Sequence, residues 1–419
     1  VRLVSAFVEE MDLSELYKTY GRIRKHQATP RQMLKLVIYA AMNRIYSSRD
    51  IRKACKRDIN FMYLLEGMPA PDHATIARFI SLHFSVCAKA LLAQMSDLLY
   101  LLGEISGKTI FIDGTKIESV ANKYTFVWKR AITKNQVRLY TKLSSFVAEC
   151  EELYGIKMVY HDRISIHTLK RLKKQLCRIK VREGIVFVHG IGRRKTQLQK
   201  SLEQLDQYLE KLKEYTKKLY ALGDRNSYSK TDPDATFMRM KEDAMLNGQL
   251  KPAYNIQHGV DSEYITWLDI SSHPTDTCTL IPFLKDMDRY LGFKYSEIVA
   301  DAGYESEENY LFIEKNGQTA YIKPQNYEIS KTRKYKKDIS RRENMEYHAD
   351  SDSYICRNGR ELIATNERRS KTVSGYVSIK TYYRSPDCTG CPYKTDCIKG
   401  NNCKTPMEKR NKVLMFQRR

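Results

Sequence analysis

The sequence has no long apolar run. No stretch approaches the ~20 consecutive apolar residues that a membrane helix needs, and the N-terminus has no secretory signal pattern. These two absences argue against a membrane protein and a secreted protein, and they predict a soluble protein of the cytoplasm. The chain begins at Val1 rather than at Met, which predicts that its true start is missing.

Acidic residues are in deficit. The 419 residues include 72 Lys and Arg but only 49 Asp and Glu, which gives a formal net charge of +23. A positive field of this size attracts polyanions, so nucleic acid is the expected partner; a basic protein without such a partner is the alternative. Hydrophobic residues make up 42% of the chain, which is typical of a globular protein with roughly two or three domains.

Residues 1–105 have a helical pattern. Thr29 precedes a proline, which is a common helix start. Several short helices with interleaved Arg and Lys suit an all-α DNA-binding domain, in which Arg52, Lys53 and Arg78 are candidate DNA contacts. A plain helical packing domain is the alternative.

The character of the chain changes to β-rich at Lys108. Thr109–Ile112 predicts a short strand that ends at Asp113, and Glu297–Ala300 predicts another that ends at Asp301. Acidic side chains at the ends of adjacent strands can converge at one edge of a sheet, where carboxylates bind hard divalent cations such as Mg²⁺ or Mn²⁺. We therefore predict that Asp113 and Asp301 are catalytic and bind the metal ion. Each is followed closely by Gly, and an Asp-Gly pair alone more often marks a turn.

The remaining pattern predicts a mixed α/β domain over 106–330. Further strands are expected at Ala253–Val260, Tyr264–Ile270 and Thr319–Ile322, and Pro274 and Asp276 interrupt the chain after the second of these. Between the first two strands of the domain, a leucine seam predicts a helical hairpin insertion at about 125–222. The hairpin has three open interpretations: a DNA contact, a dimer contact or a solvated face.

Residues 331–419 form a basic and cysteine-rich tail. Its basic run is predicted to be a mobile phosphate-binding loop, with a merely solvated loop as the alternative. Outside the N-terminal domain, the candidate DNA contacts are Lys123, Lys251, Lys334, Lys336 and Lys337.

Four cysteines crowd the tail, at Cys388, Cys391, Cys397 and Cys403. Zinc needs about four thiolate or imidazole ligands, and Cys356 or His348 could replace one member of this set. The spacing has one tight pair rather than two, so two interpretations stay open: a Zn²⁺ site, or reduced structural thiols.

Several sequence blocks carry a family resemblance. They are Tyr46–Arg49, Pro71–Phe79, Phe111–Glu118, Ala121–Trp128, Ser227–Phe237, Gln249–Asn255 and Ala300–Tyr304. In this order they resemble the DDE transposases of bacterial insertion sequences, in the branch with a helical N-terminal domain and a cysteine cluster.

The resemblance implies a ribonuclease-H-like catalytic domain in which Asp113 and Asp301 are the first two acids of a metal-binding triad. The implied reaction hydrolyses a DNA strand at the transposon end, after which the freed 3′ hydroxyl attacks target DNA. It further implies double-stranded DNA as the partner, a homo-oligomer on that DNA, and a place at the bacterial nucleoid.

The third acid of the triad is not found. In the family it is a Glu beyond the cysteine cluster, whereas this chain stops at Arg418-Arg419. Glu343 and Glu346 precede the cluster, and Glu408 has the wrong neighbours. We therefore expect a C-terminally truncated transposase that is inactive or weakly active. The alternatives are a transposase-derived DNA-binding protein without catalysis, and a metal-dependent nuclease without strand transfer.

Overall fold

The structure is a computed structural model that describes residues 1–22, 26–160, 163–190, 194–240, 248–372, 374–400 and 403–417. The chain divides into two compact units. The first comprises Val1–Gly114, Gln257–Asp269 and Asp276–Arg419. The second comprises Thr115–Ile256 and Ile270–Thr275. The terminal Arg418 and Arg419, where a truncation was expected, lie outside the described residues.

The N-terminal part is helical, as predicted. Its helices are α1 (Arg2–Glu10), α2 (Ser14–Lys18), α3 (Pro30–Met42), α4 (Ser48–Arg57), α5 (Ile59–Leu65), α6 (His73–Arg78), the π-helical η1 (Phe79–Phe84) and α7 (Ser85–Leu101). Thr29 and Gln32 cap α3 reciprocally, each side chain accepting a hydrogen bond from the backbone N–H of the other. This capping box, followed by Pro30, confirms the predicted helix start.

Lys35 is a buried cation in the core of these helices. Its side chain is 1% exposed, and its Nζ lies 2.6 Å from Glu9 of α1 and 2.7 Å from Glu66 after α5. Burial opposes the charge on Lys35, but the hydrogen bonds to the two carboxylates outweigh it and raise its pKa. The hydrogen bond from Lys35 is also the largest cause of the lowered pKa of Glu9 and of Glu66. The three side chains thus join α1, α3 and α5 by charge.

This arrangement predicts acid sensitivity of the N-terminal helices. Because the two carboxyl pKa values lie below the ordinary value of 4.5, their stabilisation is complete above that value and is lost as the pH falls through the lower folded pKa. Replacing both Glu9 and Glu66 with Gln should cost about 3 kcal/mol at pH 7, since it leaves the Lys35 ammonium buried without a charged partner. The measurement is hydrogen exchange of α3 between pH 7 and pH 3.

The control for this prediction is Glu15→Gln, which removes an exposed partner of the exposed Lys18 and should change little. Equal protection of α3 in the double variant and the unmodified chain would contradict the prediction.

The continuous helix from His73 to Leu101 is long and apolar enough, by length and composition alone, to cross a membrane. A search for an unbroken apolar run in the sequence misses this segment. Ile76, Phe79 and Leu91 of this helix are buried in the N-terminal core, while its Lys89 forms ion pairs with Asp269 and Asp286. One such helix is weak evidence for a membrane span, since the core helix of a soluble protein passes the same test of length and composition.

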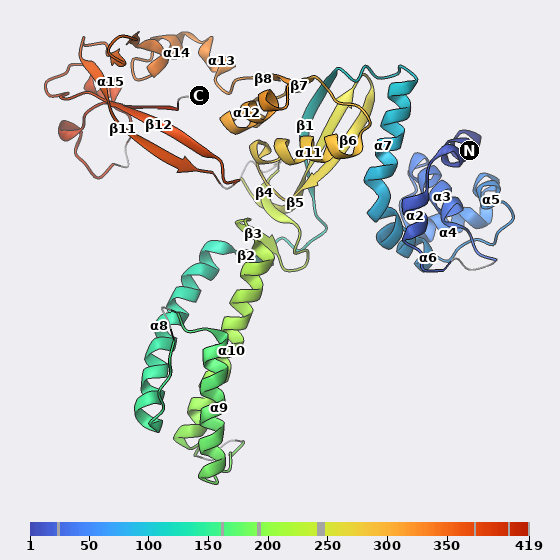
Figure 1. The fold of residues 1–419 in the computed structure, drawn as a ribbon, viewed down its shortest axis with the longest axis horizontal. Helices are drawn as coiled ribbons and strands as arrows, with labels where there is room; N and C mark the ends of the chain where they lie inside the picture. The colour runs from blue at the N-terminus through green and yellow to red at the C-terminus, as the bar shows by residue number, and fades with distance from the viewer. Residues whose placement is uncertain are drawn as a thin grey trace. The chain divides into compact units, whose positions relative to one another are not determined.

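The largest sheet of the described residues is mixed and six-stranded (Figure 1). Its strands are β1 (Thr109–Glu118), β4 (Thr236–Arg239), β5 (Leu250–Asp261), β6 (Tyr264–Ser271), β7 (Glu297–Ala300) and β8 (Thr319–Ile322). The order is β4-β5-β1-β7-β8, with β6 on β5. Strands β1, β7 and β8 run parallel. The predicted strands are confirmed, except that β1 continues past Asp113 to Glu118 instead of ending there.

The two faces of this sheet differ in burial. Ile110 and Ile112 of β1 point into a core that also contains Trp267 of β6. Helices η2 (Asp276–Cys278), α11 (Leu280–Tyr290), η3 (Ala302–Tyr304) and α12 (Glu307–Lys315) follow the later strands. Phe111 is 54% exposed, because successive side chains of a strand point to opposite faces. Asp113 shares the open face with Phe111.

The insertion contains three helices rather than the predicted hairpin. They are α8 (Lys129–Tyr154), α9 (Ile166–Arg182) and α10 (Gln197–Leu222), and β2 (Phe126–Trp128) pairs with β3 (Ser227–Ser229) at their base. Gly155, with a left-handed φ of 62°, ends α8, and Ser165 caps α9 through the backbone of Thr168. The predicted leucine seam of α10 is buried.

The described part of the tail contains helices and strands, and its basic run includes helix α14, which corrects the prediction of a loop there. It contains α13 (Tyr327–Ser330), α14 (Arg333–Lys337), η4 (Arg342–Asn344), α15 (Lys394–Cys397) and η5 (Met407–Lys409). A five-stranded antiparallel sheet follows the order β13-β12-β11-β10-β9. Its strands are β9 (Glu346–His348), β10 (Ser353–Ile355), β11 (Glu361–Lys371), β12 (Val377–Arg384) and β13 (Val413–Gln417).

Candidate active site

Two acidic residues lie side by side on the open face of the sheet. The parallel register pairs Ile112 of β1 with Ala300 of β7. Asp113 and Asp301 directly follow these two residues in the chain. Both acids are exposed, and both border one hollow of about 380 Å³. Its other lining residues are Phe111, Ile112, His258, Val260, Val299, Ala300 and Lys323. The structure thus brings together the two acids that the sequence singled out.

Backbone hydrogen bonds fix both carboxylates. Oδ1 of Asp113 accepts from the N–H of Gly114 at 2.8 Å. Oδ1 of Asp301 accepts from the N–H of Gly303, also at 2.8 Å, and so caps η3. Such local bonds limit the rotation of a carboxylate, which is how a rigid scaffold holds reacting groups in position.

Tyr304 is a buried side chain near the two acids, and the charges that act on its hydroxyl include that of a third carboxylate. Its side chain is fully buried, and its hydroxyl donates a hydrogen bond to Oε1 of Gln257. Burial raises the pKa of Tyr304, and the negative charges of Asp276, Asp113 and Asp301 raise it further. Asp276, which the sequence analysis treated only as an interruption after a strand, therefore belongs to the surroundings of this site.

Two glycines provide the space for Asp276. A Cβ at Gly114 would lie 2.9 Å from Oδ1 of Asp276 and 2.8 Å from Nε2 of Gln257. A Cβ at Gly303 would lie 3.2 Å from Oδ2 of Asp276 and 3.0 Å from Oδ1 of Asp301. Any other residue at Gly114 would push these polar groups apart, so glycine at this position serves close packing rather than a turn.

The acid pair fits a divalent cation with oxygen ligands. Mg²⁺ commonly takes only one or two carboxylates and completes its shell with water and substrate phosphate, and the exposed Asp113 and Asp301 offer that donor set. Within the described ranges, no group of three or more His, Cys, Asp or Glu side chains is arranged to hold a metal ion. Glu343, Glu346 and Glu408 lie in η4, β9 and η5 of the tail and do not line the hollow.

The N-terminal candidates for DNA contact fall into two places. Arg52 and Lys53 belong to a hollow of about 420 Å³ whose lining residues are all basic: Arg49, Arg52, Lys53, Lys56, Arg57 and His73. Arg52 is held by an ion pair of 3.1 Å with Asp72, the residue that caps α6. Arg78 lines a separate hollow of about 230 Å³ and donates to the backbone oxygen of Ala74.

Two other candidates have local partners in the second unit. Nζ of Lys251 forms an ion pair of 2.7 Å with Glu118, and Nζ of Lys123 lies 5.4 Å from the ring centre of Tyr124. These contacts give both lysines structural roles beside any contact with DNA.

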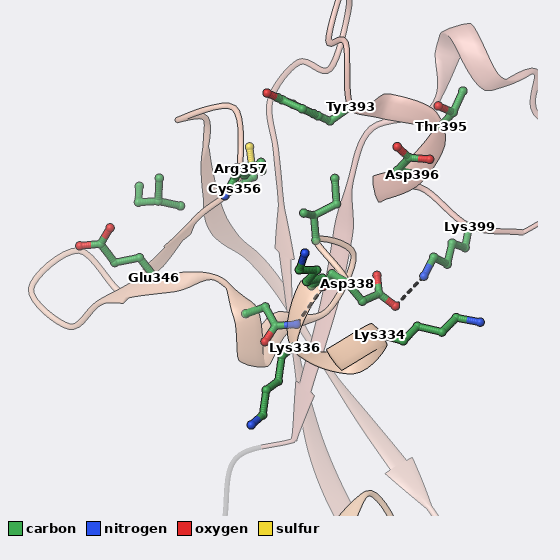
Figure 2. A pocket seen from close by; sticks show the side chains of 14 residues that line it. Lys334, Lys336, Asp338, Glu346, Cys356, Arg357, Tyr393, Thr395, Asp396 and Lys399 are labelled. Atoms are coloured by element: carbon green, nitrogen blue, oxygen red, sulfur yellow. Dashed lines mark hydrogen bonds and ion pairs between the residues drawn. The ribbon is translucent and has the colours of Figure 1, made fainter. Parts of the chain in front are cut away.

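The tail candidates border a hollow of about 970 Å³ (Figure 2). Lys334, Lys336 and Lys337 of α14 share its wall with Arg357 and Lys399. Its acidic lining residues are Asp338, Glu346 and Asp396. Figure 2 shows Lys399 reaching Asp338, at 2.6 Å, and this bond is the largest cause of the strongly lowered pKa of Asp338. Five cations thus face three acids, which leaves the wall basic.

The tail cysteines only partly follow the predicted zinc set. Burial raises the pKa of the Cys397 thiol, and Cys356, Cys388 and Cys391 are near enough to raise it further. Cys403 is exposed, and the backbone N–H of Thr405 lowers its pKa. Because no metal-holding group is found among the described residues, the geometry gives the Zn²⁺ prediction no support. Metal analysis of the purified chain would test it.

Comparison with known families identifies the chain. Residues 1–82 match the family described as a transposase domain (DUF772), and residues 225–385 match the transposase DDE domain. The chain belongs to the DDE transposases of insertion sequences. No curated protein and no solved structure matches it.

As a transposase, the protein is of an enzyme family that acts on DNA and uses a divalent metal ion, typically Mg²⁺ or Mn²⁺. The DDE match implies the ribonuclease-H-like fold, in agreement with the mixed α/β sheet and the helices that precede it. The matched residues include Asp276 and Asp301, whereas Asp113 precedes them. The pairing of β1 with β7 is what joins Asp113 to the matched region.

Proposed function

We propose that this transposase cleaves a DNA strand at the end of its insertion sequence and joins the freed 3′ hydroxyl to target DNA. Asp113 and Asp301 hold the divalent cation in this proposal. The observation that carries it is the position of these two carboxylates, on adjacent parallel strands and at the rim of one hollow.

The residues around the hollow have different roles in the proposed reaction. A divalent cation at this place would polarise the phosphate and stabilise the charge of the leaving oxygen. Asp113 and Asp301 would bind and orient it through oxygen. Lys323 lines the same hollow, but its Nζ is paired with Glu328 at 2.7 Å, so it would have to leave that ion pair to contact a DNA phosphate. The open face of the sheet lets a strand of DNA approach the acids from solvent.

DNA binding is assigned to the basic hollows. The helical part (1–105) and the tail (331–419) carry them at α4 and α14, on either side in sequence of the catalytic part (106–330). Backbone contacts of this kind hold DNA independently of its sequence. We also expect a homo-oligomer on the DNA, and association with the nucleoid.

The second candidate function is DNA binding without catalysis. It is favoured by one observation: the described residues that line the hollow include two acids, not the three that the resemblance implies. We therefore expect this 419-residue polypeptide to cleave DNA slowly at best.

Nicking of supercoiled plasmid DNA tests the proposed function. In Mn²⁺ or Mg²⁺ we expect slow nicking that stops when EDTA is added and is absent in Asp113→Ala, because the site then has one cation ligand fewer. Glu314→Gln, at the exposed end of α12 and outside the hollow, serves as the control. Nicking that persists in Asp113→Ala would exclude this site, while DNA binding without any nicking would favour the second candidate.

A further inference from the structure

The loop between β6 and α11 brings Asp276 close to the acid pair. Oδ2 of Asp276 and Oδ1 of Asp301 lie 3.2 Å and 3.0 Å from the same point, the position of a Cβ on Gly303. The two oxygens are therefore separated by no more than the sum of these distances. Oδ1 of Asp276 lies 2.9 Å from the position of a Cβ on Gly114, the residue that follows Asp113. Asp276 thus lies between the two segments that carry the acids.

The position of Asp276 is fixed from the core side. Nε2 of Gln257 donates to its Oδ1 at 3.5 Å, and Gln257 in turn accepts from the buried Tyr304. The backbone oxygen of Asp276 accepts from the N–H and the hydroxyl of Thr279, at 3.0 and 2.9 Å. Asn309 of α12 donates to the backbone of η2 at 3.2 Å. These bonds hold the carboxylate at the site before any ligand arrives, which is what preorganisation requires.

We propose that Asp276 is a third carboxylate of the cation site of Asp113 and Asp301, an inference that rests on the function proposed above. Asp276 is a positioning residue here: it acts from outside the direct ligands, by its charge and by accepting hydrogen bonds from water around the cation. Three carboxylates in so small a space repel one another. A divalent cation relieves that repulsion, so Asp276 increases the affinity of the site for the cation.

Direct binding of Mn²⁺ to the full chain, measured by calorimetry or by electron paramagnetic resonance, tests this role without any DNA. Loss of a supporting carboxylate commonly weakens metal binding by about 10- to 100-fold, so Asp276→Asn should raise the dissociation constant at least about tenfold. Asp276→Glu should recover part of the affinity. In Glu314→Gln, which removes the same charge from the exposed end of α12, the affinity should be unchanged.

Thermal denaturation separates positioning from a merely structural role. Without Mn²⁺, Asp276→Asn should melt at the same or a higher temperature than the unmodified chain, because one repulsive charge is gone. With Mn²⁺ its gain in melting temperature should be smaller. A lower melting temperature together with an unchanged Mn²⁺ affinity would assign Asp276 to the fold and overturn the proposal.

The failure of this inference and the failure of the proposed function give different results. If Asp113→Asn loses Mn²⁺ and Asp276→Asn binds it like the unmodified chain, only the role of Asp276 is wrong. If neither substitution changes the affinity, or if the unmodified chain binds no Mn²⁺, the cation site itself is wrong and both proposals fall.

Discussion

Removing the exposed basic side chains of α4 should weaken the binding of duplex DNA by a hundredfold or more at about 0.1 M salt. The four substitutions are Arg49→Ala, Lys53→Ala, Lys56→Ala and Arg57→Ala. These residues recur at helical spacing along one face of α4, while Ile51 and Cys55 face the core. Each DNA phosphate that is no longer neutralised should reduce the slope of log affinity against log salt by about one, so the slope should fall by about four.

The readout is fluorescence anisotropy with a labelled duplex at several salt concentrations. A matched control removes four exposed lysines of α10 instead, at Lys200, Lys211, Lys213 and Lys217. If both quadruple variants lose the same affinity, either net charge governs binding or α10 also contacts DNA, and the basic hollow of α4 has no special role. Alanine is a strong helix former, so α4 should persist, and circular dichroism would verify that it does.

Trp267→Ala should be the most destabilising single change in the catalytic sheet, at about 3–5 kcal/mol. Trp267 is completely buried in β6, with its ring 5.5 Å from that of Tyr290. It belongs to the hydrophobic core against which β1 and β7 pack. Its indole nitrogen is buried without a hydrogen-bond partner among the described residues. Trp267→Phe removes that unsatisfied donor and keeps most of the ring, so its cost should be below about 1.5 kcal/mol.

Hydrogen exchange of β7 measures the opening of this core in both variants. Trp128→Ala is the control and should leave β7 protected. Trp128 is the other tryptophan of the chain and is half-buried. Equal losses of protection in Trp267→Ala and Trp267→Phe would mean that the indole nitrogen has a stabilising role, contrary to the expectation.

The sequence predicted the parts of the fold that depend on local pattern. Strands β5, β7 and β8 alternate or cluster apolar residues over a few positions, and Thr29 carries its own helix-start signal. The tail sheet was missed because β11 consists largely of exposed polar and charged residues, so a period of two is hidden. The helical hairpin was wrong because one glycine, Gly155, ends α8 early.

The candidate site was predictable only in part. Asp113 and Asp301 each follow an apolar strand segment, and that placement together with the resemblance pointed to them. Asp276 carries no such signal. Its relation to the site depends on how closely Gly114 and Gly303 approach it, a tertiary contact that no local pattern encodes.

The parallel pairing of β1 with β7 also orders events in time. Thr109 and Glu297 meet across 188 positions of sequence, and contacts between such distant residues form late because a long loop must close first. During synthesis the strand that leads to Asp301 emerges well after the helices of the N-terminal part. A growing chain therefore carries the basic hollow of α4 long before it carries the acid pair, so the proposed DNA-binding surface forms before the proposed cation site.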